Sequence, residues 1–443
     1  MKATSRQFLK SKITQNAASL YMVQACRKLL PLFVLPYLAR VLGPAGWGNV
    51  AYAQGVGEFI SIFVEFGFIL SATRDLAQSK GSKAECGRIA VGTFGAQAVL
   101  ATIGILVALA VSSQVPLLRS HPRLLCAGLV YGVAQGMTPT WLFQGLERMT
   151  LAAFLEITSK VAALGAIFLF VHSPSDEWKV LAFQSLAPVV SVLAGIWVAH
   201  RFLTLYLPTF DMVWESIKVG WKMFLLRSGL ATYSTANVLI LAMFAPAGIV
   251  GYYASAEKVS KAIVGLLLPI RDAFYPRLSQ LAAHSVTETQ RLTRISAYIE
   301  VGCGLMLSIA TFAGAHLIVR IVFGPTFEAA VPILQILALL PLITSLADAI
   351  GLQSLLPAGK ESLVMIAIVA GGLVNLAFAV MLAPRFMAEG MAVSVVLAEV
   401  AVCTVLVCIV ARTTALFRKG VSHRPDVPAF ASRTVEATTR IGE

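Results

Sequence analysis

The sequence predicts an all-α protein that crosses a membrane about twelve times, and three observations carry this prediction. Hydrophobic residues make up 58% of the 443 residues and charged residues only 13%, whereas soluble domains are about a quarter charged. The apolar residues gather in long segments, and a membrane helix needs about 20 mostly apolar residues. The loops between the segments are mostly short, so none could fold into a soluble catalytic domain of ordinary size.

The apolar segments follow one another along almost the whole chain. They cover residues 16–40, 47–71, 89–112, 124–143, 151–171, 179–200, 219–244, 250–270, 295–319, 329–354, 362–383 and 390–412. The first segment is preceded by basic residues, but it is long and lacks the small-residue site of a cleaved signal peptide. We therefore expect it to remain as the first membrane helix.

The net charge of +13 is explained by membrane topology. Alternate loops and tails carry 23 Lys and Arg on one side and 6 on the other. Because cytoplasmic loops are enriched in Lys and Arg, both termini are predicted to be cytoplasmic and the number of spans to be even. Anionic lipid accounts for the basic surface, so no nucleic-acid partner is expected.

The chain divides into two similar halves. Residues 48–54 resemble residues 251–257, and each stretch follows a Pro-Ala-Gly turn, at 44–46 and 246–248. Six spans per half would give both halves the same orientation, related by an axis along the membrane normal. We predict an N-lobe at 1–209, a C-lobe at 210–416 and a flexible cytoplasmic tail at 417–443, where the sequence turns polar.

Basic residues in the middle of the predicted spans are the main functional signal. They are Arg27, Lys28, Lys160, Arg227, Lys258 and Lys261. A Lys or Arg at the centre of a membrane helix costs about 2.5–3.5 kcal/mol to insert, so these side chains must face a wet cavity or partners. A cationic cavity indicates an anionic cargo. Lys160 has Glu156 four residues before it, which favours a pair that neutralises itself.

Polar residues on the same spans complete the predicted substrate site. Gln24 lies beside Arg27 and Lys28, and Asn237 follows Arg227. The predicted substrate-binding set is Arg27, Lys28, Arg227, Lys258, Lys261, Gln24, Gln54 and Asn237.

Acidic residues inside the spans are candidates for ion coupling. They are Glu58, Glu65, Glu257 and Asp348. Gln54, Glu58 and Glu65 share one helical face, which lines a cavity or joins neighbouring helices. Glu257 is spaced to pair with Lys261, and one carboxylate cannot also neutralise Lys258. The alternative to an anion site is a structural network that includes Glu58 or Glu300.

Enzyme signatures are missing from the sequence. It has no HExxH, GxSxG or nucleotide-binding P-loop sequence, and its Cys and His residues are dispersed. We therefore expect no catalytic residue, no cofactor and no metal site, and ATP hydrolysis on this chain is excluded.

Several short strings, in order, resemble one transporter family. They are PYLARVLGP at 36–44, EFGF at 65–68, SATR at 71–74, VGYYASAEKV at 250–259, FGP at 323–325, AVPIL at 330–334, GLQSLLPAG at 351–359 and GMA at 390–392. From about residue 12 to 412 the chain resembles the O-antigen and exopolysaccharide repeat-unit flippases of the multidrug/oligosaccharidyl-lipid/polysaccharide exporter superfamily. The family pattern has an aspartate where this sequence has Glu65.

The resemblance implies two six-helix lobes around a central cavity, in the bacterial inner membrane. It also implies a cargo of undecaprenyl-diphosphate-linked oligosaccharide, moved from the cytoplasmic to the periplasmic leaflet, and the polysaccharide polymerase and other biosynthesis proteins as further partners. Lys and Arg suit a diphosphate, and Tyr52, Tyr233, Tyr252 and Tyr253 could line space for sugars. Moving about two negative charges outward from a cytoplasm at about −100 mV is favoured by about 4–5 kcal/mol.

Three other functions remain open from the sequence. A cation-coupled multidrug exporter of the same superfamily would need acidic rather than basic cavities for its cationic drugs. A lipid-linked peptidoglycan-precursor flippase would normally have fourteen spans, and a membrane-embedded polymerase or ligase would need a large periplasmic loop.

Overall fold

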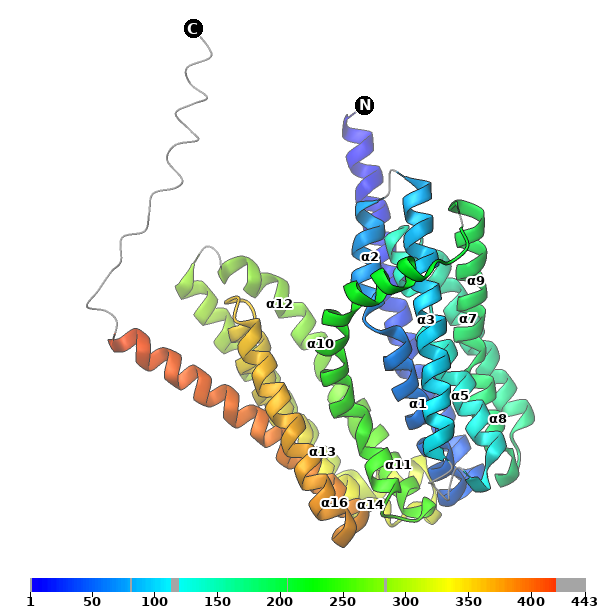
Figure 1. The fold of residues 1–443 in the computed structure, drawn as a ribbon. Helices are drawn as coiled ribbons and strands as arrows, with labels where there is room; N and C mark the ends of the chain where they lie inside the picture. Colours follow the sequence, from blue (N-terminus) through cyan, green and yellow to red (C-terminus); the bar gives the residue numbers. More distant parts are fainter. Residues whose placement is uncertain (1, 80–81, 113–118, 205, 283–284, 420–443) are drawn as a thin grey trace.

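The structure is a computed structural model that describes residues 2–79, 82–112, 119–204, 206–282 and 285–419. Side chains are described except at 2–32, 111–112, 226–234, 282, 286 and 413–419. In these ranges the chain is helical and contains no strand. Figure 1 shows two groups of helices that meet at the lower end and diverge toward the upper end. We call these the closed end and the open end.

The first helical group extends from α1 to α9. Its helices are α1 (Lys2–Glu65), α2 (Phe68–Gln78), α3 (Lys83–Ser112), α5 (Pro122–Met137), α6 (Thr140–Gly145), α7 (Met149–Phe170), the 3-10 turn η1 (Pro174–Asp176), α8 (Glu177–Gln184) and α9 (Leu186–Phe202). Helix α1 contains the whole of the predicted first span and most of the second. Its backbone turns at Gly43, whose φ of 67° favours glycine.

The second helical group extends from α10 to α16. Its helices are α10 (Phe210–Ala242), α11 (Ala247–Val264), η2 (Gly265–Leu267), α12 (Leu268–Ala282), α13 (Val286–Val322), η3 (Pro325–Phe327), α14 (Ala330–Leu337), α15 (Leu340–Ile350), the π-helical turn η4 (Gly351–Leu355) and α16 (Glu361–Lys419). Helix α16 joins the predicted last two spans through a non-helical residue, Met387.

Seven helices within the described residues are long and apolar enough to cross a membrane. The chain is therefore a multi-pass membrane protein. One of these helices, at Glu361–Arg412, includes the last two predicted spans, and another, at Phe33–Gln78, includes the second span and the end of the first. The predicted spans at 124–143, 219–244 and 250–270 are not among the seven. In the last of them, Glu257, Lys258 and Lys261 lower the hydropathy. The number of twelve spans thus remains a prediction.

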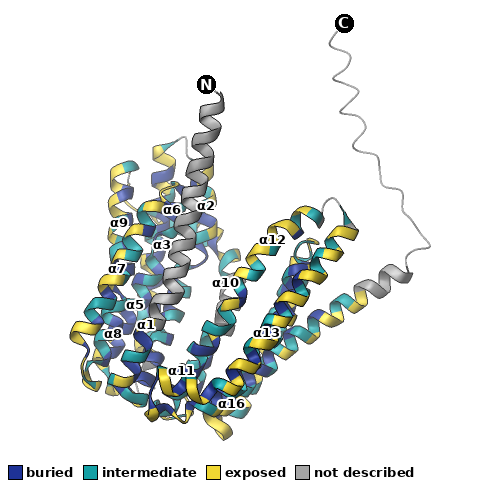
Figure 2. Cartoon of the chain, turned by 180° about the vertical axis from the view of Figure 1, so that it is seen from behind, coloured by how far each residue is buried: buried dark blue, intermediate teal, exposed yellow. Residues whose placement is uncertain are grey.

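The core at the closed end is shared by both helical groups. Trp47 and Val50 from α1 are almost fully buried together with Val250 and Tyr253 from α11 and Phe323 after α13. Figure 2 shows this buried junction, while the outer faces of both groups carry many exposed residues. Those outer faces include large apolar side chains such as Leu169 and Leu373, as expected for surfaces in contact with lipid.

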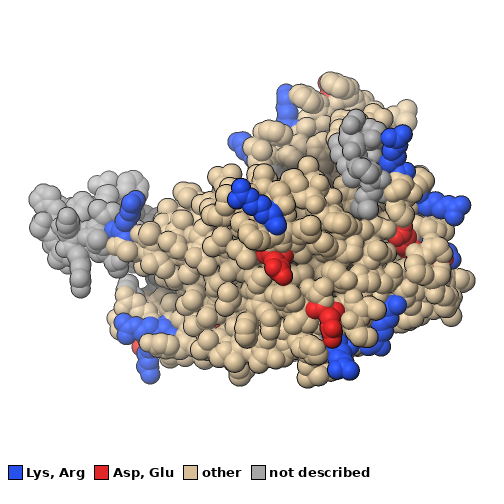
Figure 3. All heavy atoms as spheres, turned by 90° about the horizontal axis from the view of Figure 1, so that it is seen from below, with Lys and Arg blue, Asp and Glu red and all other residues tan. Residues whose placement is uncertain are grey.

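The surface of the closed end carries few charges. Figure 3 shows this end with scattered Lys, Arg, Asp and Glu on an otherwise uncharged surface. The loops assigned to this side by the topology argument are those with only six basic residues. The view agrees with that assignment, and the position of the termini relative to the cytoplasm stays a prediction.

The segment that connects the two helical groups, from Thr204 to the start of α10, packs on α3 of the first group. A Cβ on Gly87 of α3 would overlap the carbonyl oxygen of Thr204, and a Cβ on Gly92 would lie 2.8 Å from that of Met212. Arg88 of α3 forms a 2.5 Å ion pair with Glu215 at the start of α10. The first turns of α10 therefore lie on α3, and the rest of the helix descends to α11 (Figure 1).

Candidate functional site

Two glycines from the two repeats cross at the closed end. Gly48 of α1 packs on the start of α11, where a Cβ would overlap the carbonyl oxygen of Ala247. Gly251 of α11 packs on α1 in the reciprocal way, and a Cβ added there would overlap the carbonyl oxygen of Pro44. The two similar stretches found in the sequence thus contact each other, and only glycine allows their backbones to approach so closely.

A side chain from α1 adds a polar contact between the groups at the same end. Arg40 donates a 2.6 Å hydrogen bond to the carbonyl oxygen of Ile321, in the last turn of α13. The last carbonyls of a helix lack partners within that helix and attract cations. Arg40 thus supports the same junction as the Gly48–Gly251 crossing.

Lys258 of α11 extends across the junction to the first helical group. Its Nζ donates a 3.2 Å hydrogen bond to Oε1 of Gln54 and lies 4.3 Å from the ring centroid of Trp47, a cation–π contact. Among the described residues, no carboxylate lies within ion-pair distance of Lys258. The charge of this lysine is therefore held by an amide and an indole, which are weaker partners than a carboxylate or a phosphate.

A cavity of about 340 Å³ opens beside Lys258 within the first group. The polar and aromatic residues that line it are Trp47, Gln54, Glu58, Tyr131, Gln135, Lys160, Gln184 and Lys258. The hydroxyl of Tyr131 donates a 2.6 Å hydrogen bond to Glu58. Lys160 is 2.9 Å from Glu156, so the predicted i, i+4 pair is confirmed. Lys258 is thus the cation in this lining that has no acidic partner among the described residues.

Glu257 forms its ion pair with Lys261 and not with Lys258. The Lys261 ammonium is 3.2 Å from Glu257, which also accepts hydrogen bonds from Asn237 at 3.5 Å and Tyr253 at 3.4 Å. Asn237 in turn accepts a 2.7 Å hydrogen bond from Asn375 of α16. These residues lie beside a smaller cavity of about 200 Å³ within the second group. The predicted Glu257–Lys261 pair is confirmed, and it leaves Lys258 without that carboxylate.

The other two acidic candidates lie in different places. Asp348 of α15 is 3.7 Å from Arg271 of α12. Glu65 is half-buried in the last turn of α1, and it is not among the residues that line the cavity beside Lys258. The structure therefore brings Gln54, Glu58 and Lys258 together, and Asn237, Glu257 and Lys261 together, and leaves Glu65 and Asp348 apart from both sets.

Four predicted substrate-binding residues fall outside the described side chains. They are Gln24, Arg27, Lys28 and Arg227. Their roles remain predictions.

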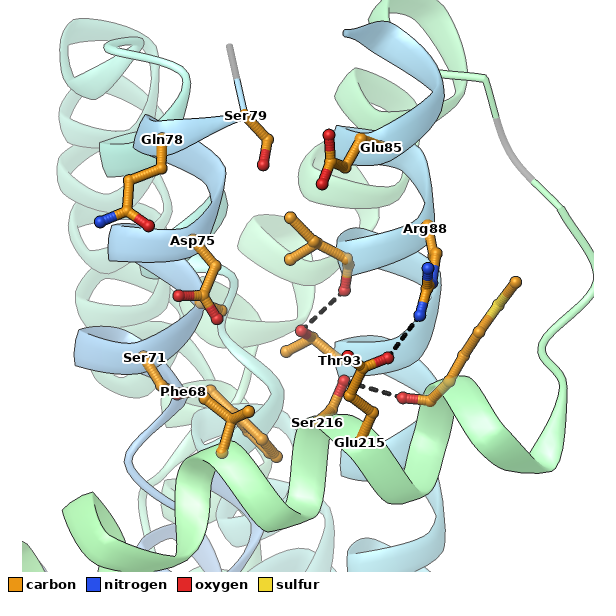
Figure 4. Close-up of a pocket in the computed structure, with 14 residues that line it drawn as sticks. Phe68, Ser71, Asp75, Gln78, Ser79, Glu85, Arg88, Thr93, Glu215 and Ser216 are labelled. Carbon is orange, nitrogen blue, oxygen red and sulfur yellow. Dashed lines mark hydrogen bonds and ion pairs between the residues drawn. The ribbon is translucent and has the colours of Figure 1, made fainter.

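A second polar pocket lies at the open end, between α2, α3 and the start of α10. It measures about 270 Å³, and Figure 4 shows Asp75, Glu85 and Glu215 around it with Arg88. Arg88 is already paired with Glu215. The pocket thus has an excess of acidic groups, which is the opposite of what an anionic cargo requires.

The sequence argument missed several residues of the main cavity, and two of the four tyrosines that it named lie elsewhere. Tyr131, Gln135 and Gln184 are isolated polar residues in otherwise apolar stretches, so no periodic pattern marked them. Tyr253 is fully buried and Tyr52 lines a separate apolar pocket, so neither lines the cavity. Tyr252 packs on Phe327, and Tyr233 lies outside the described side chains.

Known proteins resemble this chain over most of its length. The "Putative O-antigen transporter" of Escherichia coli (strain K12) is 29% identical over 408 residues, which cover 90% of this chain and 97% of that protein. A structure of the lipid II flippase MurJ in an inward closed conformation superposes with a TM-score of 0.69 at 12% identity, over 89% of this chain and 87% of that one.

A structure of an inward-facing multidrug resistance MATE family transporter of the MOP superfamily superposes with a TM-score of 0.64 at 15% identity, over 91% of this chain and 99% of that one. These similarities show a shared fold. Residues 13–282 match the family described as "Polysaccharide biosynthesis protein". Since that match covers more than half of the 443 residues, the chain belongs to the polysaccharide biosynthesis protein family.

Proposed function

We propose that this protein flips undecaprenyl-diphosphate-linked oligosaccharide repeat units from the cytoplasmic to the periplasmic leaflet of the bacterial inner membrane. The family assignment and the relative named as an O-antigen transporter support a role in polysaccharide export. The fold shared with a lipid II flippase supports the flipping of a lipid-linked cargo.

The placement of Lys258 is the observation that carries the proposal. Its ammonium lies at the junction of the two helical groups, beside a cavity, on weak and neutral partners. A diphosphate would supply two negative charges and several acceptor oxygens in place of one amide oxygen. The bound cargo would therefore form an ion pair with Lys258, a contact that the described residues do not provide.

The arrangement of the two groups suggests how the cargo moves. We propose that they are the two six-span lobes, 1–209 and 210–416, and that the open end faces the cytoplasm together with both termini. The diphosphate would enter between the lobes, and its lipid tail would stay in the bilayer. The closed end would then separate on the periplasmic side by alternating access, with Glu58, Glu65, Glu257 or Asp348 as sites for a coupling ion.

Replacing Lys258 by methionine tests the proposal. We expect Lys258→Met to weaken the binding of undecaprenyl diphosphate to the purified protein in nanodiscs by about tenfold, since a hydrogen bond to a charged group contributes about 1.5–3 kcal/mol. Lys258→Arg keeps the charge and should retain most of the affinity. Binding would be measured at one fixed salt concentration, because surface charge also attracts the anion.

Lys83 offers a matched control for this experiment. It is an exposed lysine at the start of α3, so Lys83→Met should leave the affinity unchanged. Equal affinities for Lys258→Met and the unmodified protein would contradict the assignment of the diphosphate site.

A further inference from the structure

Two glutamines in the cavity beside Lys258 have no partner in the described protein. Gln135 of α5 and Gln184 at the end of α8 both line the cavity and are half-buried. Neither side chain forms a hydrogen bond with any group in the described part of the chain. Amide groups inside a membrane protein need a hydrogen-bonding partner to offset their desolvation. We therefore expect water or a polar ligand to form hydrogen bonds with these two amides.

The other charged groups of this lining do not favour a second anion. Glu58 accepts a hydrogen bond from Tyr131, and Lys160 is paired with Glu156. Of the two lysines that line the cavity, Lys258 is the one without an acidic partner in the described residues. The part of the cavity away from Lys258 thus suits an uncharged ligand rather than a second anion.

The chemistry of the lining matches a sugar ring. Each glutamine amide carries two donors and an acceptor, which can pair with neighbouring hydroxyl groups. Gln54, Gln135 and Gln184 come from three helices, α1, α5 and α8, so they can contact a ring from different directions. The volume of about 340 Å³ lies at the small end of the range of about 300–1,000 Å³ for ligand pockets. It suits a small part of an oligosaccharide.

We propose that this cavity is a subsite for the sugar attached directly to the diphosphate, and that Gln135 and Gln184 select the cargo by its hydroxyl groups. The inference rests on the proposed function, because a diphosphate at Lys258 brings that first sugar to the cavity. The subsite lies within the first helical group, and Lys258 of the second group stands at its edge. Both helical groups would therefore hold the cargo before it moves.

The test compares two lipids on the same purified protein in nanodiscs. One probe is undecaprenyl diphosphate, and the other is undecaprenyl diphosphate that carries a single neutral hexose. We expect the unmodified protein to bind the hexose-bearing lipid more tightly. The double variant Gln135→Ala/Gln184→Ala should bind that lipid about tenfold more weakly and bind bare undecaprenyl diphosphate as before. Unchanged binding of the bare lipid also shows that the variant is folded.

Gln335 provides the control, because it is a half-buried glutamine that lines a different pocket in the second group. Gln335→Ala should change neither affinity. The single variants Gln135→Asn and Gln184→Asn keep an amide and should each lose part of the preference, which guards against failure of the double variant to fold.

The possible failures separate the two proposals. If the unmodified protein does not bind bare undecaprenyl diphosphate, the proposed function fails. If it binds both lipids equally, or if the glutamine variants keep the preference for the hexose, the sugar subsite is wrong while the diphosphate site stands.

Discussion

Replacing Gly251 by alanine is expected to reduce the population of the closed arrangement by about 10- to 100-fold. A Cβ at this position would overlap the carbonyl oxygen of Pro44, and a backbone carbonyl cannot rotate away as a long side chain can. Overpacking of a tight contact costs about 1–3 kcal/mol, and each 1.4 kcal/mol is a factor of ten. The closed end should therefore separate more often.

The separation can be measured by labelling a cysteine at position 54, in a protein with its natural cysteines replaced. A membrane-impermeant thiol reagent added from the periplasmic side should react faster in Gly251→Ala than in the unmodified protein. Gly48→Ala should behave in the same way, because it disturbs the same crossing through Ala247. The double variant should show less than the sum of the two effects, since neighbouring sites couple.

Gly248 supplies the control for the crossing. It lies three residues before Gly251 on α11, and a Cβ there would meet nothing within 4 Å. Gly248→Ala should leave labelling and export unchanged. Equal labelling rates in the Gly251→Ala and Gly248→Ala variants would show that the Gly48–Gly251 crossing does not hold the closed end together.

Removing the carboxylate of Glu177 is expected to lower the free energy of unfolding by about 3 kcal/mol. Glu177 begins α8 and is 7% exposed. It accepts a 2.9 Å hydrogen bond from Asn49 of α1 and lies 2.6 Å from Nδ1 of His121, before α5. One carboxylate thus joins three helices. A hydrogen bond to a charged group contributes about 1.5–3 kcal/mol, and the buried amide of Asn49 would lose its partner.

Glu328 is the matched control, because it also faces a histidine. Its carboxylate is 3.5 Å from His316, and both side chains are more than half exposed. Glu328→Ala should change the stability by no more than about 0.5 kcal/mol. Thermal unfolding in detergent would compare Glu177→Ala with Glu328→Ala. Similar unfolding temperatures for the two variants would show that the Glu177 contacts do not hold the three helices together.

The sequence could predict the elements of this protein that repeat or carry unusual charge. The apolar segments indicated a multi-pass helical protein, and the spacing of Glu257 and Lys261 indicated their ion pair, which the structure contains. The similarity of residues 48–54 and 251–257 indicated two related halves. It could not indicate that these stretches would cross, because contacts between distant parts of a chain leave no periodic pattern in it.

The parts that the sequence could not predict depend on tertiary packing. Gln135 and Gln184 are single polar residues in apolar surroundings, and their shared cavity becomes visible only when α5 and α8 lie together. Tyr253 looked suited to a sugar site but is buried in the junction core. A tyrosine in an apolar helix has the same appearance in the sequence whether it faces a cavity or a neighbouring helix.

The reciprocal crossing of Gly48 and Gly251 gives a single chain the geometry of a homodimer. In a two-fold contact between identical partners the same surface patch appears on both, so every substitution in the patch occurs twice in the interface. Here the two patches are encoded separately, as Pro44–Gly48 and Ala247–Gly251. One side can therefore be altered while the other is kept. A single substitution can thus change one side of this contact, which is impossible in a symmetric dimer.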